Sequence, residues 1–123
     1  MSQCIPLYSS PLIAAIEQVE SGGDKTALGD GGQAIGILQI HKCVVDDVNR
    51  VFHLKWSHED MYKPEYARMV FRRYMQIYAT EERLGRPVTD EDRARIWVGG
   101  PRGWQKESTV KYWLKVKQQM EKQ

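Results

Sequence analysis

The sequence predicts a mainly α fold: a helical domain interrupted by one short glycine-rich hairpin or loop insertion. Apolar residues recur at helical spacing in five stretches, which is typical of helices packed on a core. Between residues 24 and 40 this spacing stops, and glycines divide a short apolar run, as turns or a small hairpin require. A chain of 123 residues can bury one core but not two, so we expect a single domain over 1–123.

The first predicted helix runs from Ser10 to the glycine pair Gly22-Gly23. Serine is a favoured N-cap residue, and Pro11 suits the first helical position. Glycine beyond the last apolar residue commonly ends a helix. The apolar face of this helix is expected to carry Leu12, Ile13, Ile16 and Val19.

Two more helices are expected in the middle of the chain, over residues 41–51 and from Pro64 to Glu82, with a connecting segment over 52–63. Proline suits the start of the longer one. The residues expected to face the core are Val44, Val45, Val48 and Val51 in the shorter helix, and Tyr66, Val70, Phe71, Tyr74, Ile77 and Tyr78 in the longer one.

The last two helices are predicted from capping signals. Thr89 is expected to cap the first of them, because Asp92 stands three residues later, as in a capping box. This helix ends at Gly99-Gly100. The final helix is expected to begin near residues 108–109. The residues expected to be buried are Ala94, Ile96 and Trp97, followed by Val110, Trp113, Leu114 and Met120.

Composition and charge limit the classes of partner. Hydrophobic residues make up 41% of the chain and charged residues 28%, the mix of an ordinary globular protein. The net charge of +2 suits an anionic surface but does not indicate nucleic acid. No apolar run approaches the roughly 20 residues that span a bilayer, so we expect no membrane insertion. We expect a monomer.

Cysteines and histidines give no sign of a metal or a cofactor. Cys4 and Cys43 could form one disulfide that pins the N-terminal arm, or remain two buried thiols; we expect free thiols. His41, His53 and His58 have no spacing typical of a shared metal site. His41, at an expected helix start, could line a cleft or lie on the surface. We expect no metal and no cofactor.

Glu20 is the strongest candidate for a chemical role. It lies seven residues after Ile13 and four after Ile16, on the apolar face of the first helix. It also lies in the last turn, where the helix dipole disfavours negative charge. Burial and the dipole both raise a carboxyl pKa, as a general acid requires. Position alone also fits a helix-end carboxylate bonded to an amide or arginine. Glu17 is expected to point to the polar side and to be solvated.

Three motifs from Glu20 onward resemble the catalytic core of the lysozyme-like superfamily: Glu20-Ser21-Gly22-Gly23, Gly29-Asp30-Gly31-Gly32 and Gly36-Ile37-Leu38-Gln39-Ile40. Soluble lytic transglycosylases and goose-type lysozymes share the Glu-Ser start and the Gly-x-x-Gln element. The resemblance is closer to invertebrate-type lysozymes and their bacterial and phage relatives. It extends through the later motifs Tyr74-Met75, Tyr78-Ala79, Ala94-Arg95-Ile96, Gly99-Gly100-Pro101-x-Gly103 and Thr109-x-x-Tyr112-Trp113-x-x-Val116.

The resemblance implies that Asp30 is a second catalytic carboxylate, if one residue is deleted before Gly36. A carboxylate about 5–5.5 Å from the general acid acts as a nucleophile, and one about 6.5–9.5 Å away activates water. Asp30-Gly31-Gly32 fits a simple turn equally well. In that case the enzyme could be a lytic transglycosylase, which uses one glutamate.

The resemblance also implies a sugar-binding cleft, with the glycine-rich insertion as one wall. It places the Gly36 backbone and Gln39 in this wall, because glycine lets a backbone approach a sugar ring and an amide both donates and accepts. The alternative is a glycine turn followed by a buried glutamine bonded to the backbone. Tyr112 is implied to bind substrate.

A second part of the implied cleft is the loop after the fourth helix. Gly99 and Gly100 would let this loop run close to a ligand beneath Trp97, which could stack on a sugar or belong to the core, as could Trp104. The relatives usually carry His-Asn before Gly-Gly-Pro, whereas this chain has Trp97-Val98. A polar group that could contact substrate is therefore missing.

The resemblance implies a muramidase that hydrolyses the β-1,4 bond between N-acetylmuramic acid and N-acetylglucosamine, with Glu20 as general acid. Peptidoglycan or a chitooligosaccharide is the expected partner. The alternatives are a lytic transglycosylase that forms 1,6-anhydro products and an inactive glycan-binding module. The small number of cysteines favours a bacterial or phage protein over an animal one.

The expected place of action is the cell wall, in the periplasm or outside the cell. The first residues, Met1 to Cys4, show no basic region followed by an apolar stretch, so no signal peptide is expected. Release by phage lysis, a dedicated secretion route or excision from a longer protein would then bring the chain to the wall.

Overall fold

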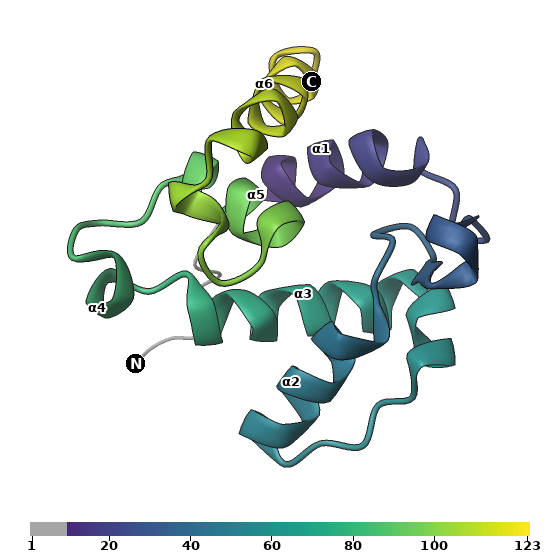
Figure 1. Cartoon of the computed structure of the whole chain (residues 1–123). Coiled ribbons are helices and arrows are strands. Elements are labelled where there is room, and N and C mark those ends of the chain that lie inside the picture. Colours follow the sequence, from purple (N-terminus) through teal and green to yellow (C-terminus); the bar gives the residue numbers. More distant parts are fainter. Residues whose placement is uncertain (1–9) are drawn as a thin grey trace.

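The structure, a computed structural model, describes residues 10–123 and confirms the mainly α fold with one small antiparallel hairpin. Figure 1 shows α1 between α6 on one side and α3 on the other, with α2 packed against α3. None of the helices over 10–123 is long and apolar enough to cross a bilayer. In chain order the elements are α1 (Ser10–Ser21), β1 (Leu28–Gly29), η1 (Asp30–Gly32), β2 (Ala34–Ile35), α2 (Lys42–Phe52), η2 (His58–Tyr62), α3 (Pro64–Tyr78), α4 (Glu81–Leu84), α5 (Asp90–Gly99), η3 (Gly103–Gln105), η4 (Glu107–Thr109) and α6 (Val110–Glu121).

The glycine-rich insertion forms the expected hairpin. β1 pairs antiparallel with β2, with Leu28 opposite Ile35. The η1 turn joins them through two glycines in the left-handed region, Gly31 at φ 65° and Gly32 at φ 93°. Since glycine adopts positive φ without steric penalty, it suits both positions. The hairpin is followed by a short segment, residues 35–40, that leads into α2.

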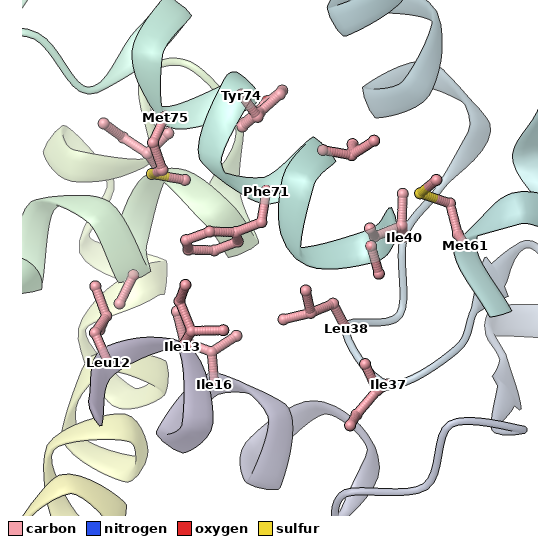
Figure 2. Packing of buried hydrophobic residues seen from close by; sticks show 14 of the residues in the cluster. Leu12, Ile13, Ile16, Ile37, Leu38, Ile40, Met61, Phe71, Tyr74 and Met75 are labelled. Atoms are coloured by element: carbon pink, nitrogen blue, oxygen red, sulfur yellow. The ribbon is translucent and has the colours of Figure 1, made fainter. Parts of the chain in front are cut away.

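The hydrophobic core lies between α1, α3 and the 35–40 segment. Leu12 and Ile16 of α1 face Phe71 of α3, and Leu38 fills the space beside them (Figure 2). All four side chains are fully buried. Since burial of one such side chain stabilises a fold by about 1.5–3 kcal/mol, this cluster fixes α1 and the 35–40 segment relative to each other.

Capping decides where two of the predicted helices begin and end. The Thr89 side chain accepts from the Asp92 backbone amide, and the Asp92 carboxylate accepts from the Thr89 amide, so the predicted capping box is confirmed. The long helix, expected to reach Glu82, ends instead at Tyr78. Thr80 caps a separate short helix, α4, because its hydroxyl accepts from the Arg83 amide.

Two side chains expected in the core are exposed. Leu114 is 53% exposed and Val51 38% exposed. On α6 the buried residue is Val116, and Leu114 lies two residues before it, on the opposite side of a helix with 3.6 residues per turn. The neighbouring face carries Tyr112 and Met120, which pack against the core. The prediction that Leu114 faces the core is therefore wrong.

The cysteine prediction is corrected in part. Cys43 is a free thiol, as expected, but it is exposed rather than buried. Cys43 lies near the start of α2, on the face opposite Val45 and Val48, which are buried in the core. Cys4 lies outside the described residues.

The prediction that Glu17 is solvated is wrong. Its side chain is only 9% exposed and forms a two-pronged ion pair with Arg68 of α3, with Nε–Oε2 and Nη2–Oε1 distances of 2.7 and 3.2 Å. A carboxylate taken out of water needs such a partner. The sequence did not reveal this pairing because the two residues lie 51 positions apart.

Arg68→Met is expected to lower the free energy of unfolding by about 2 kcal/mol. Loss of one partner of a buried pair usually costs about 3–5 kcal/mol, and the exposure of Arg68, 39%, reduces that figure. Urea denaturation measures the loss. Arg72→Met, at a neighbouring arginine outside the pair, is the control. If Glu17→Met/Arg68→Met is as unstable as Arg68→Met alone, the unpaired carboxylate is not the cause.

Candidate active site

Glu20 lies in the last turn of α1, with its side chain largely withdrawn from water. Burial raises the pKa of its carboxyl group above the usual 4.5, because a low-dielectric surrounding disfavours the charged form. A hydrogen bond from Tyr112 and the positive charge of His41 oppose this effect but do not cancel it. Glu20 therefore holds its proton at a higher pH than an ordinary glutamate.

The partner of Glu20 comes from the last helix of the chain. The Tyr112 hydroxyl, on α6, donates to Glu20 Oε2 over 2.7 Å, although the residues lie 92 positions apart. Burial and the neighbouring Glu20 carboxylate raise the pKa of Tyr112 well above its usual value, so the phenol stays protonated and keeps its donor. The Tyr112 hydroxyl therefore holds Oε2 of Glu20 in place where α6 packs on α1.

Tyr112→Phe is expected to raise the pKa of Glu20 further. The tyrosine hydrogen bond favours the ionised carboxylate and lowers its pKa, so loss of that donor favours the protonated form. An NMR titration that follows the ¹³C shift of the Glu20 carboxyl carbon measures the change directly. Tyr66→Phe, at a tyrosine that stacks on Trp56, is the control. A Glu20 midpoint that is unchanged or lower in Tyr112→Phe would contradict the assigned role.

Glu20 opens into a small pocket of about 120 Å³. Ligand pockets usually enclose about 300–1,000 Å³, so this one accommodates only part of a larger molecule. Three segments far apart in the sequence meet here: the end of α1, the start of α2 and the end of α5. The lining residues are Glu20, Gln39, Ile40, His41, Val44, Trp97 and Val98.

Gln39 lines the pocket, but its amide group mainly supports the backbone. Its Nε2 donates to the carbonyl oxygens of Ala27 and Gly36, over 3.2 and 2.9 Å. The amide group has two N–H donors, so both are used within the protein. The Gln39 backbone has a φ of 51°, a left-handed conformation that these bonds hold in place. Gln39 is thus bonded to the backbone, as in the alternative interpretation, but it is half-buried rather than buried.

Gly36 is buried and does not line the pocket. Its φ is 80°, and a Cβ atom there would collide with the backbone carbonyl of Met61 in η2. Its amide donates to the Ala27 carbonyl over 2.8 Å. Glycine is therefore required at this position because two backbone segments approach each other closely there.

Asp30 lies at the hairpin turn with a φ of 51° and a side chain that is 67% exposed. It does not line the Glu20 pocket. Its Oδ2 is 2.6 Å from Nε2 of His41, and His41 does line that pocket. Asp30 therefore contacts His41, a residue of the pocket wall, without lining the pocket itself.

The candidate site residues at the end of α5 divide into two groups. Trp97 lines the pocket and also packs on Phe71 and Tyr74, with ring centroids 4.7 and 5.6 Å apart, so it belongs to both core and site. Gly99 and Gly100 do not line the pocket. The Gly99 carbonyl accepts from Lys106 over 2.7 Å, and Gly100 ends α5 with a φ of 86°.

The sequence analysis missed or undervalued the contributions of Val98 and Ser21 to the site. Val98 lines the pocket with an apolar side chain. The Ser21 hydroxyl donates to the Ile37 carbonyl over 2.8 Å and so joins the end of α1 to the 35–40 segment. The serine after the candidate acid was the available signal for this bond. Over residues 10–123, no group of three or more His, Cys, Asp or Glu side chains is arranged to hold a metal ion.

Comparisons with known proteins support the fold through solved structures alone. No family model matches the chain, and no curated protein matches its sequence. Two crystal structures contain a chain with a similar fold. In the structure of PliI from Aeromonas hydrophila in complex with the lysozyme of Meretrix lusoria, the identity is 28%, the TM-score 0.79, and the alignment covers 94% of this chain and 93% of the other. In the structure of an inhibitor-bound lysozyme from Meretrix lusoria, the identity is 28%, the TM-score 0.78, and the coverage 93% and 92%.

Proposed function

We propose that the chain is a peptidoglycan-cleaving glycosidase, a muramidase that hydrolyses the β-1,4 bond between N-acetylmuramic acid and N-acetylglucosamine. The observation that carries the proposal is Glu20: its pKa is raised by burial, Tyr112 holds one of its oxygens, and it opens into a pocket. Glycoside hydrolysis near neutral pH needs a carboxylic acid that is still protonated. Action on this substrate requires delivery to the cell wall, in the periplasm or outside the cell.

The similarity to known structures favours an enzyme over an inhibitor. Both crystal structures contain the Meretrix lusoria lysozyme, whereas PliI is named in one of them. The identity is the same in both, and the coverage differs by one percentage point for each chain. The lysozyme is therefore the component that best accounts for both matches.

In the proposed reaction, Glu20 donates its proton to the glycosidic oxygen as the bond from that oxygen to the anomeric carbon breaks. The leaving sugar departs with a hydroxyl group, and the anomeric carbon develops positive charge. The oxygen of a water molecule then bonds to this carbon, and one proton of that water returns to the Glu20 carboxylate. Asp30, held by His41, supplies negative charge that stabilises the developing positive charge.

The second candidate is a lytic transglycosylase, favoured by the position of Asp30 outside the pocket lining. In this reaction the C6 hydroxyl of the muramic acid residue, rather than water, attacks the anomeric carbon. Glu20 first donates a proton to the leaving oxygen and then accepts the proton of that hydroxyl. The product carries a 1,6-anhydro end.

Mass spectrometry of the fragments released from purified peptidoglycan tests the proposal. Reducing ends on muramic acid support hydrolysis, and 1,6-anhydro ends support the transglycosylase. If no fragment is released, the muramidase proposal fails. Two further measurements then identify the alternative: slower action of an added lysozyme indicates an inhibitor, and binding of chitooligosaccharides without turnover indicates an inactive glycan-binding module.

A further inference from the structure

The proposed reaction uses His41 only to hold Asp30, although His41 also lies beside Glu20 in the pocket wall. It precedes α2 as its N-cap residue, with extended backbone angles (φ −85°, ψ 155°). Its side chain lines the Glu20 pocket and also a larger neighbouring pocket of about 400 Å³. The imidazole therefore belongs to the wall that the two pockets share. The other residues that line the larger pocket are Gly32, Gln33, Lys42, Cys43 and His58.

The Asp30 carboxylate needs a partner to hold one orientation. The Asp30 side chain, at the hairpin turn beside Gly31 and Gly32, is 67% exposed, so little packing restrains it. The 2.6 Å contact with His41 Nε2 is the hydrogen bond recorded for this carboxylate among the described residues. His41 itself follows the 35–40 segment, which Gln39 and Gly36 hold against the hairpin and η2. His41, which follows a restrained backbone segment, thus holds the exposed side chain of Asp30.

The other charged groups around His41 have partners elsewhere. Lys42, next in the chain, forms an ion pair with Asp46 at 2.9 Å. His58, from η2, has its Nε2 atom 2.7 Å from the Ile40 carbonyl oxygen. Glu20, from α1, shares the pocket with His41, and a positive charge on His41 lowers the pKa of Glu20. Between Asp30 and Glu20, His41 is the titratable side chain that interacts with both.

We propose that His41 is a positioning residue that connects the two carboxylates: it holds Asp30 at the edge of the pocket that His41 lines together with Glu20. This inference rests on the proposed glycosidase function. A positive charge on the imidazole lowers the pKa of Glu20. The histidine therefore lowers the upper pH at which Glu20 still serves as the acid, in addition to orienting Asp30.

His41→Gln and His41→Ala separate these two effects. Glutamine keeps an N–H donor for Asp30 but carries no charge. Both variants are expected to move the basic limb of kcat/KM to higher pH, because loss of a positive neighbour raises the pKa of Glu20. His41→Ala is also expected to lower kcat roughly tenfold, and His41→Gln to restore most of that loss. The matched control is His58→Gln, which is expected to leave the limb unchanged.

A double-variant cycle tests whether His41 acts through Asp30. Asp30→Asn is expected to lower kcat about as much as His41→Ala, and Asp30→Asn/His41→Ala is expected to be no slower than either single variant. The inference is wrong if the two losses multiply, if Asp30→Asn has no effect, or if both His41 variants lower activity equally at every pH. Titration of Glu20 by ¹³C NMR gives the same pH shift without activity, so a failure of the glycosidase proposal is distinguished from a failure of this one.

Discussion

Glu20→Gln is expected to reduce the rate of peptidoglycan cleavage by about a thousandfold or more. A positioned general acid contributes about 10²–10⁴-fold, and glutamine cannot donate a proton to a leaving oxygen. The amide has nearly the same shape and can accept the Tyr112 hydroxyl at 2.7 Å. The loss is therefore expected in kcat, with little change in substrate binding. Release of soluble fragments from labelled peptidoglycan measures it.

Two controls make this result specific. Glu82→Gln, at an exposed glutamate in α4, is expected to keep full activity. Glu20→Asp keeps the acid but withdraws it by one methylene, so it is expected to lose activity as well. A Glu20→Gln protein that still releases fragments at more than about a tenth of the original rate contradicts the assignment of a general acid to this position.

Glu20→Gln is not expected to unfold more easily than the original chain. The pKa of Glu20 is raised in the folded chain, whereas an unfolded glutamate ionises near pH 4.5. The folded state therefore binds more protons above that pH, and stability falls as the pH rises towards the folded pKa of Glu20. Glutamine removes this penalty. Thermal unfolding at neutral pH is expected at the same temperature as in the original chain, or a higher one, so loss of activity cannot be attributed to loss of the fold.

Gly36→Ala is expected to destabilise the fold by about 3 kcal/mol or more. The backbone has a φ of 80°, where a side chain costs about 1–2 kcal/mol. The added Cβ would also collide with the Met61 carbonyl, and overpacking costs about 1–3 kcal/mol. Because a backbone group cannot rotate away, the 35–40 segment must move from η2. The free energy of unfolding in urea measures this effect.

Gly85→Ala is the matched control for Gly36→Ala. Gly85 has a nearly equal φ of 76°, but an added Cβ there meets no atom within 4 Å. Its expected cost is only the conformational one, about 1–2 kcal/mol. The difference between the variants isolates the clash with Met61. Equal losses at the two positions would show that the close approach at Gly36 contributes nothing.

The sequence predicted the helices well because their signals are local. The Thr89–Asp92 capping box lies within four residues, and the helical spacing of Ile13, Ile16 and Glu20 needs only one helix. The faces of the helices were harder to predict. Leu114 is as apolar as Val116, and only the packing of α6 on α1 and α5 decides which of the two is buried.

The site was predictable where one element determines it. Glu20 at a helix end gave a correct direction for its pKa. The partners of the acidic residues were not predictable, because tertiary contacts supply them. Arg68 reaches Glu17, Tyr112 reaches Glu20, and His41 reaches Asp30 across 51, 92 and 11 positions. No periodicity in the sequence carries that information.

The Tyr112–Glu20 hydrogen bond has a consequence for the order of events during protein synthesis. The acid belongs to the first helix and its donor to the last, 92 positions later. While the chain leaves the ribosome, α1 can form long before α6 exists, since helices form in microseconds and translation adds about 5–20 residues per second. Throughout that interval Glu20 lacks its phenol partner and the helix that shields it from water. The chemical identity of the acid is therefore acquired only after α6 has been synthesised and packs against α1.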